Sequence, residues 1–502
     1  MKYLLNAEQM KACDQATTEV FKMPSLVLME RAALAVRDAV LERFPDAFRI
    51  LVVCGSGNNG GDGYAAARLL NLAGRTADVL FVGKHDHRTE QTALQAEIFR
   101  RYGGRELPDD TSLKGYDLIL DALFGIGLKR DVIGRYADVI CAMNRVNTPV
   151  TAVDIPSGIS ADSGRICGCA VRADLTVTMQ YAKLGQMLYP GADLCGEVLV
   201  RDVGITDEHV EWKEDPVYAL EKDDLKDLLP LRRPDANKGT YGKLLLIAGA
   251  KNMAGAAVLS GDAALRGGCG LVKILSDEGN RNILQTALPE ALFAPRAGEE
   301  DLREGLEWAD AVAIGPGLGQ SDRNRALLSV VLREWKGPLV MDADALNLIA
   351  KDPSLSEWIP QRAVLTPHPG EMSRLSALFA GGKRSVSEVA ADPVGAAVSC
   401  CEAFGCITVM KGARTVIADS QQVFLNLCGN EGMACGGSGD VLTGIIGSLL
   451  AQGADPADAA KAGVLLHAMS GDAAAEKLGT RSMKAGDLVS FLPAVLQTWN
   501  TV

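Results

Sequence analysis

The segment ILVVCGSGNNGGDGYAAARLL, residues 50–70, decides the fold of the first part of the chain. Residues 50–54 are uniformly apolar and predict a buried strand, whereas the Ala- and Leu-rich end predicts a helix. A glycine-rich turn joins them without a spacer. A strand that passes through such a turn directly into a helix is typical of the first βα unit of a parallel sheet. We therefore expect a Rossmann-like domain around this segment.

The alternation of short apolar runs and helical stretches continues to about residue 205. Residues 206–234 are acidic and polar and contain prolines, and the alternation restarts at GKLLLIAGA, residues 242–250. Such a change of composition marks a domain boundary. We therefore predict two α/β domains, residues 1–215 with a Rossmann-like parallel sheet and residues 216–502 with a second α/β sheet.

Composition and charge exclude several classes of protein. The chain has 51 Lys and Arg against 63 Asp and Glu, and its net charge of −12 opposes sequence-independent binding to nucleic acid. The start MKYLLNAEQM lacks a signal-peptide core, and no uncharged apolar run reaches the ~20 residues that a membrane span needs. The 12 cysteines form no CxxC pair, which favours reduced thiols. We expect a cytoplasmic protein with neither a nucleic-acid nor a membrane partner.

The first glycine-rich turn contains polar side chains that a simple phosphate-binding turn does not need. GSGNNG fits the GxGxxG spacing, so an ordinary dinucleotide-binding turn is the alternative. Asn58, Asn59 and Asp62 add oxygens that can bind a cation or orient a polar ligand. Two later strand ends add Asp121 and the segment DIPSG, residues 154–158. Each of these alone is also common in caps and turns, but their convergence at one sheet edge predicts a site.

In this order, GSGNNGGDG, DALFGIGL and DIPSGISADSG resemble the epimerase of the NAD(P)H-hydrate repair family, over about residues 1–206. The resemblance implies that the hydrated dinucleotide contacts two segments and one aspartate, namely Asn58, Asn59, Gly60, Gly61, Asp62, Gly125, Ile126, Gly127, Leu128, Lys129, Arg130, Asp131 and Asp154. It also implies a potassium ion held by Asn59, Asp121 and Ser157. Ile126 departs from the family, which often has threonine there.

The epimerase reaction that this resemblance implies inverts the hydroxyl-bearing carbon of the reduced nicotinamide ring. Inversion requires proton transfer by a positioned acid or base. Asp121 and Asp154 are the candidates, and the sequence does not separate their roles. Lys183 in YAKLG is a third candidate, for which the alternative is an ordinary surface lysine.

A second glycine-rich loop, GNEGMACGGSGDVLTGIIGSLL at residues 429–450, runs into an apolar helix near Asp440. Backbone N–H groups at a helix start stabilise negative charge, and an adjacent aspartate can accept a proton from a hydroxyl. A helix-capping aspartate is the plain alternative, and the P-loop pattern GxxxxGK[ST] is absent. The loop is similar to the anion hole of ribokinase-like kinases and therefore predicts phosphoryl transfer.

Further motifs place polar or glycine residues at expected strand ends. They are KGART (411–415), TPHPGE (366–371), DADAL (342–346) and IGPGLG (314–319). His368 lies between two prolines in a rigid turn, so we expect it to contact a ligand. His467 lies in the apolar stretch GVLLHAMSG, which predicts a structural histidine with satisfied hydrogen bonds.

With AGAAVLSGDAALRGGCG at residues 254–270, these motifs resemble the ADP-dependent NAD(P)H-hydrate dehydratase over about residues 216–502, which implies a ribokinase-like domain. The resemblance implies that the adenine nucleotide binds to Lys411, Gly412, Ala413, Arg414, Thr415 and Gly439. It implies that the hydrate binds to Ala256, Gly317, His368 and Asp440. Glu431, Cys435 and Ser438 depart from the usual proline and threonines, and none of them removes an implied catalytic group.

The dehydratase reaction that the resemblance implies moves a phosphoryl group from ADP to the ring hydroxyl. Elimination then restores NADH or NADPH and leaves AMP and phosphate. Asp440 would deprotonate the hydroxyl, and backbone N–H groups with a magnesium ion would stabilise the transferred charge. No residue decides between NADH hydrate and NADPH hydrate as the preferred substrate.

Two other functions are compatible with the motifs. A ribokinase-like small-molecule kinase with a regulatory N-terminal domain would release a phosphorylated acceptor instead of NAD(P)H. A non-enzymatic N-terminal scaffold should have lost its polar strand-end residues, and Asn59, Asp121, Asp154 and Ser157 are all present. Relatives of these domains self-associate, so we also expect a homo-oligomer.

Overall fold

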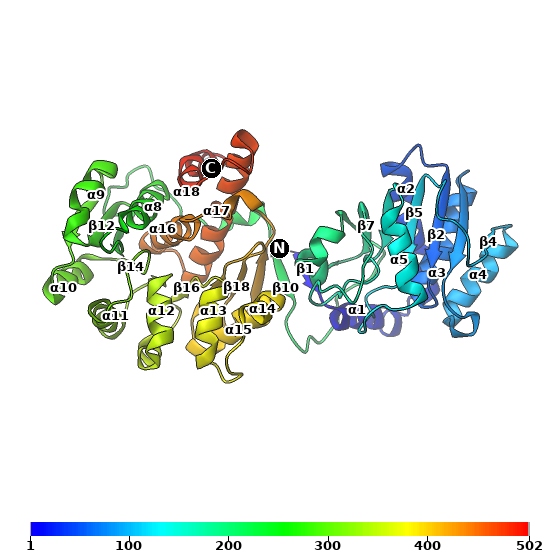
Figure 1. The fold of residues 1–502 in the computed structure, drawn as a ribbon, viewed down its shortest axis with the longest axis horizontal. Coiled ribbons are helices and arrows are strands. Elements are labelled where there is room, and N and C mark those ends of the chain that lie inside the picture. Colours follow the sequence, from blue (N-terminus) through cyan, green and yellow to red (C-terminus); the bar gives the residue numbers. More distant parts are fainter. Residues whose placement is uncertain (1, 500–502) are drawn as a thin grey trace. The chain divides into compact units, whose positions relative to one another are not determined.

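Two units, residues 2–217 and residues 218–499, make up the described part of the chain in the computed structural model (Figure 1). We call them the N-terminal unit and the C-terminal unit. Each contains a mainly parallel sheet and its own buried apolar clusters, so the predicted α/β class is confirmed. Within residues 2–499, no helix combines the length and the apolar character needed to cross a membrane.

The N-terminal unit contains a seven-stranded parallel sheet in the order β4-β3-β2-β5-β6-β7-β9, and β1 pairs with β8 beside it. The strands are β1 (Lys2–Leu5), β2 (Arg49–Cys54), β3 (Thr76–Phe81), β4 (Glu106–Leu107), β5 (Leu118–Ala122), β6 (Val150–Val153), β7 (Leu175–Met179), β8 (Ala182–Lys183) and β9 (Glu197–Arg201). The order reverses direction between β2 and β5, and ligands of open α/β sheets bind at such a point.

Strand β2 is buried on both faces, as expected of a central parallel strand. Ile50 and Val52 face a cluster that includes residues of α2, α3 and α4, whereas Leu51 and Val53 face a cluster that includes α5. Helices therefore cover both faces of the sheet. The helices of this unit are α1 (Ala7–Glu19), α2 (Ser25–Arg43), α3 (Asn58–Leu72), α4 (Glu90–Arg101), α5 (Arg135–Arg145) and α6 (Leu184–Met187).

The sheet of the C-terminal unit runs β13-β12-β11-β14-β15-β16-β17-β18-β19, with β10 beside β19. Pairing is parallel from β13 to β17 and antiparallel in the β17–β18–β19 meander. The strands are β10 (Val217–Leu220), β11 (Lys243–Ile247), β12 (Leu271–Ser276), β13 (Leu292–Pro295), β14 (Ala311–Ile314), β15 (Leu339–Met341), β16 (Val364–Leu365), β17 (Ile407–Met410), β18 (Val416–Ala418) and β19 (Val423–Asn426).

Helices α8, α16, α17 and α18 pack with one face of this sheet in a single large apolar cluster. Leu244 and Leu246 of β11 belong to that cluster, whereas Leu245 between them packs against Gly305 of α10 on the other face. The helices are α7 (Leu225–Leu228), α8 (Ala254–Arg266), α9 (Arg281–Ala287), α10 (Glu299–Trp308), α11 (Asp322–Glu334), α12 (Asp344–Lys351), α13 (Pro369–Leu375), α14 (Val386–Ala391), α15 (Pro393–Phe404), α16 (Ser438–Ala451), α17 (Pro456–Leu478) and α18 (Ala485–Gln497).

Candidate active sites

The turn between β2 and α3 is packed so closely that two of its glycines cannot be replaced without movement. A Cβ atom at Gly55 would lie 2.0 Å from the carbonyl oxygen of Leu123, and one at Gly60 would lie 2.0 Å from the carbonyl oxygen of Gly55. Residues 58–62 are the first five residues of α3. The turn therefore lies against the loop that follows β5, and the start of α3 lies against the turn.

Asp121 and Ser157 meet at the carboxyl ends of β5 and β6. Asp121 is fully buried, and its carboxylate accepts hydrogen bonds from Ser157 Oγ at 2.6 Å, from Ser157 N at 2.7 Å and from Leu123 N at 3.2 Å. Burial raises the pKa of Asp121 to about 6 although these hydrogen bonds act to lower it. Within residues 2–499 no lysine, arginine or histidine forms an ion pair with this carboxylate. The site therefore holds a buried acid without a counter-charge from the protein.

Asn59 lies beside this pair. It is buried in the first turn of α3, and its side-chain Nδ2 has no hydrogen-bond partner among the described residues. A Cβ atom at Gly125 would lie 3.4 Å from that of Asn59, so the Gly125–Asp131 loop begins against it. Ile126 packs against two apolar clusters. Amide, carboxylate and hydroxyl groups thus gather where the sequence predicts a site.

Asp62 and Asp154 face the same region. Burial raises the pKa of Asp62 well above its ordinary value, and the negative charge of Asp154 adds to the effect. Asp154 follows β6 and contacts Lys183, whose side chain has 0% exposure. The interpretation of Lys183 as a surface lysine is therefore wrong, because YAKLG folds back over the end of β6.

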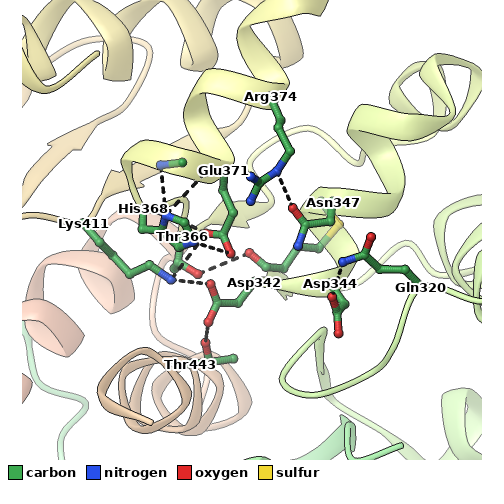
Figure 2. A network of polar contacts seen from close by, with 12 residues as sticks. Gln320, Asp342, Asp344, Asn347, Thr366, His368, Glu371, Arg374, Lys411 and Thr443 are labelled. Carbon is green, nitrogen blue, oxygen red and sulfur yellow. Dashed lines mark hydrogen bonds and ion pairs between the residues drawn. The ribbon is translucent and has the colours of Figure 1, made fainter. Parts of the chain in front are cut away.

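In the C-terminal unit, Lys411 is the centre of a polar network (Figure 2). Its Nζ lies 2.5 Å from Asp342 Oδ1 and 3.8 Å from Glu371 Oε2. Thr443 Oγ1 donates to the other oxygen of Asp342 at 2.8 Å. Burial acts to lower the pKa of Lys411, but the charges of Asp342 and Glu371 raise it above its ordinary value. The network joins the ends of β15 and β17, helix α13 and helix α16.

His368 begins helix α13 and fixes Glu371. Its Nδ1 accepts hydrogen bonds from Gly370 N at 2.9 Å and Glu371 N at 3.4 Å, and its Nε2 lies 3.2 Å from Glu371 Oε1. A neutral imidazole that accepts at Nδ1 carries its proton on Nε2, so the ring can donate to the carboxylate. Burial acts to raise the pKa of Glu371, but His368 and Lys411 hold it below its ordinary value.

The second glycine-rich loop ends at α16, which begins at Ser438 with Gly437 in the left-handed region at φ 95°. Asp440 lies in the first turn, and burial, with a further contribution from Asp342, raises its pKa to about 6. A Cβ atom at Gly439 would lie 3.2 Å from Lys411 Nζ, so the lysine lies directly over the helix start. The arrangement places backbone N–H groups, an ammonium and a carboxylate together.

His467 of α17 forms a hydrogen bond with the first residue of α16, where this loop ends. Its Nε2 lies 2.9 Å from the carbonyl oxygen of Ser438, and burial lowers the pKa of His467 to about 4. The ring is therefore neutral and hydrogen-bonded, and the prediction of a structural histidine is confirmed.

The remaining predicted residues of this unit lie on two further elements. Gly317 follows β14 at φ 54°, and a Cβ atom there would lie 3.0 Å from that of Ala256 in α8. Residues 411–415 form the connection between β17 and β18, with Arg414 donating to the carbonyl oxygen of Leu427 at 2.6 Å. Ala256 and Gly317 are thus neighbours, and KGART is a hairpin turn that starts at the Lys411 network.

Three residues of the network were not predicted as site residues: Asp342, Glu371 and Thr443. Asp342 and Glu371 belong to the motifs DADAL and TPHPGE, which the sequence places at strand ends without indicating a role for these two side chains. Thr443 lies one helical turn beyond Gly439, on the face that carries the helix start. Among residues 2–499, no group of three or more His, Cys, Asp or Glu side chains is arranged to hold a metal ion.

Two family models match the chain. One, described as NAD(P)H-hydrate dehydratase, matches residues 244–494, and the other, described as YjeF-related protein N-terminus, matches residues 25–185. The bifunctional NAD(P)H-hydrate repair enzyme of Moorella thermoacetica is 38% identical over 99% of this chain and 97% of its own length. The corresponding Escherichia coli enzyme is 37% identical over 98% of this chain and 93% of its own length.

Solved structures resemble the second half of the chain. A ribokinase-like superfamily protein from Enterococcus faecalis has a TM-score of 0.52 and 29% identity, and covers 58% of this chain and 99% of its own. The ADP/ATP-dependent NAD(P)H-hydrate dehydratase from Bacillus subtilis, co-crystallised with ATP and Mg2+, has a TM-score of 0.50 and 31% identity. It covers 57% of this chain and 99% of its own. The ribokinase-like fold expected for this part is therefore confirmed.

Proposed function

The chain belongs to the family of bifunctional NAD(P)H-hydrate repair enzymes, and we propose that its two sites divide the work between residues 1–215 and residues 216–502. The protein is an NAD(P)H-hydrate epimerase and an NAD(P)H-hydrate dehydratase. In the proposed division, the N-terminal site interconverts the R and S hydrates. The C-terminal site dehydrates the S form with ADP.

The observation that carries the dehydratase assignment is the position of Lys411 Nζ and Asp440 at the start of α16. The N–H groups of the helix start and the lysine would receive the phosphate groups, with residues 411–415 and Gly439 against the nucleotide. Ala256, Gly317, His368 and Asp440 would hold the hydrate. Both ligands would then meet at the carboxylate of Asp440.

The proposed dehydration proceeds in two steps, phosphorylation of the ring hydroxyl and elimination of phosphate. Asp440 takes the proton of the ring hydroxyl while the hydroxyl oxygen bonds to the β-phosphorus of ADP. The bond between that phosphorus and the oxygen of AMP breaks. The carbon–oxygen bond then breaks, the phosphorylated oxygen leaves as phosphate, and the proton lost by the neighbouring ring carbon passes to that phosphate as the double bond forms. The products are NAD(P)H, AMP and phosphate, and nothing is oxidised or reduced.

Magnesium fits this site as a companion of the nucleotide. Asp342, Asp344, Glu371 and Asp440 all act on the charge of the same region, where Lys411 is the neighbouring cation. Magnesium usually retains several waters and binds through one or two carboxylates plus substrate phosphates. We assign Asp342 and Glu371 as the protein groups that would hold it. When bound, it would neutralise charge on the transferred phosphoryl group.

Potassium fits the N-terminal site. The uncompensated buried carboxylate of Asp121, the hydroxyl of Ser157 and the side-chain amide oxygen of Asn59 form an oxygen-rich set. Such a set suits a large monovalent ion better than zinc, which prefers Cys and His. We propose that these three residues hold potassium beside the hydrate, which lies on residues 58–62, residues 125–131 and Asp154. When bound, the ion would supply the missing positive charge.

One assay tests the proposed function. The purified protein is supplied with a mixture of R and S hydrates and ADP, and the absorbance of reduced nicotinamide is followed. We expect complete recovery of NAD(P)H, because epimerisation feeds the S form to the dehydratase. Release of a phosphorylated product without recovery of NAD(P)H would instead indicate a kinase.

Nucleotide choice should favour ADP over ATP. Lys411 is already paired with Asp342 and Glu371, so the additional negative charge of ATP would meet a region of excess carboxylates. We expect faster dehydration with ADP at equal concentration, measured with magnesium in excess so that the metal does not limit either reaction. Much faster turnover with ATP would contradict this prediction.

Dehydration should lose rate at low pH with an apparent pKa of about 6 in kcat/KM, the value to which burial and Asp342 raise the pKa of Asp440. A base must be ionised to accept a proton, so the rate falls as pH falls through 6 and is constant above it. The phosphates of ADP also titrate near this pH. The variant Asp342→Asn distinguishes titration of Asp440 from titration of ADP. Loss of the negative charge of Asp342 should shift the fall in kcat/KM to lower pH. A fall caused by titration of ADP would stay at the same pH.

We propose that the protein forms a homo-oligomer and that it lies in the cytoplasm. Val20, Phe21, Leu26 and Val27 are exposed between and within α1 and α2, which supports association of several copies. All 12 cysteines are free, which supports the cytoplasm as the compartment. The substrates would be the hydrates of NADH and NADPH.

A further inference from the structure

The backbone of Asp154 has an unusual conformation that its neighbours hold in place. Its φ of 66° lies in the left-handed region, which is strained for a residue other than glycine. Asp154 N donates to the carbonyl oxygen of Val177 at 2.8 Å, and Gln186 Nε2 donates to the carbonyl oxygen of Asp154 at 2.7 Å. Strain that is fixed from two sides is typical of a functional position.

The carboxylate of Asp154 is held by one oxygen. Lys183 Nζ, Thr178 Oγ1 at 3.2 Å and Met179 N at 3.2 Å all donate to Oδ1. Within residues 2–499 no donor meets Oδ2, and the side chain is 16% exposed. One oxygen is therefore fixed while the other is open to a ligand.

Lys183 has no proton left for a substrate. Its ammonium donates to Asp154 Oδ1, to Thr178 Oγ1 at 2.8 Å and to the carbonyl oxygen of Met179 at 3.1 Å. These bonds use all three of its N–H groups. With 0% exposure, it acts through Asp154 and not on the substrate directly.

Asp121, the other candidate acid, is the proposed ligand of potassium, so the lone pairs that its hydrogen bonds leave free are not available to the substrate hydroxyl. Both of its oxygens accept hydrogen bonds, and its side chain is fully buried. We propose that Asp154 is the catalytic carboxylate of the inversion, through Oδ2, and that Lys183 is its positioning residue. This inference rests on the proposed epimerase function of the N-terminal unit.

The inversion requires proton transfer and bond rotation but no oxidant or reductant. Hydration of the enamine in NAD(P)H places the hydroxyl on the carbon bonded to the ring nitrogen. Asp154 Oδ2 takes the hydroxyl proton as the carbon–nitrogen bond breaks, with the bond's electron pair moving to nitrogen and a carbonyl forming. Asp154 then gives the proton to nitrogen. Rotation about the adjacent carbon–carbon bond exposes the other carbonyl face, and the same steps in reverse close the ring.

The test measures interconversion of the separated R and S hydrates in Lys183→Ala, with kcat and KM determined separately. We expect kcat to fall at least ~30-fold with KM nearly unchanged, because positioning affects the transition state more than binding. The side-chain atoms removed beyond Cβ match n-propylammonium. That cation should restore activity, whereas 1-propanol of similar size should not.

Controls separate this role from stability and from the proposed function. Arg68→Met removes another ion pair of the same unit whose cation is buried, Arg68 with Glu30 at 2.5 Å, and should retain epimerase activity. Wild-type kcat in Lys183→Ala, or equal rescue by 1-propanol, would overturn the inference. If Lys183→Ala does not fold, Asp154→Asn decides: a kcat near the wild-type value would overturn the catalytic assignment. An inactive wild-type protein would overturn the proposed function instead.

Discussion

Replacing Asp440 with asparagine should lower dehydration at least ~100-fold and leave epimerisation unchanged. The amide keeps the size of the side chain but cannot accept the hydroxyl proton. The N-terminal site contains none of the residues of the Lys411 network, so its rate should not change. The measurement is the recovery of NAD(P)H from purified S hydrate with ADP, beside interconversion of the two hydrates.

A matched control for this substitution is Asp458→Asn. Asp458 lies in the first turn of α17, as Asp440 lies in the first turn of α16, and its carboxylate is 2.8 Å from Lys461 Nζ. Both substitutions remove an acid from a helix start, where a negative charge typically stabilises the helix by about 0.3–1 kcal/mol. Only Asp440→Asn should lose dehydratase activity. A normal rate for that variant would remove Asp440 from the mechanism.

Replacing Asp121 with alanine should abolish potassium binding and epimerase activity while dehydration of the S hydrate continues. The variant removes the only charged group of the proposed ion site, and we expect potassium affinity to fall at least ~100-fold, the upper end for residues that merely support metal ligands. Potassium titration of the epimerase rate measures this loss. A crystal grown in potassium salt should show the ion in the wild-type protein alone.

Asp117→Ala is the control at the opposite end of the same strand. Asp117 precedes β5 and accepts hydrogen bonds from Phe48 N at 3.0 Å and Arg49 N at 2.7 Å, so its loss also leaves two backbone donors without their partner. Asp121→Ala should lose about 1–3 kcal/mol of stability for each buried donor left unpaired, and Asp117→Ala should lose less because its site is exposed. If Asp121→Ala keeps the ion and full epimerase activity, the ion assignment is wrong.

The fold could be predicted because its signals are local. Alternation of apolar runs and helices identifies the parallel sheets, and the acidic stretch after residue 205 lies where the structure divides at residues 217 and 218. The residues expected to share a sheet edge, such as Asp121 and Ser157, are in contact because parallel strands end on the same side.

The contacts within each site could not be predicted, because they join segments far apart in sequence. Lys183 is 29 residues from Asp154, and only the return of the chain after β7 shows that it is buried. Asp342 and Thr443 are 101 residues apart, and no pattern within either motif indicates their hydrogen bond. The distinction between Asp121 and Asp154 likewise depends on which carboxylate oxygens are occupied.

The close packing at Gly55 and Gly60 limits how this enzyme can be changed. Each position would place an added methyl carbon 2.0 Å from a backbone oxygen, so even the smallest side chain requires the turn to move. Substitutions at Gly55 or Gly60 should therefore move the turn and abolish epimerase function. Residues 127, 129 and 130 of the neighbouring loop are exposed and carry no such restriction. Libraries that aim to shift the choice between NADH and NADPH hydrates should therefore vary this loop and leave the glycine turn intact.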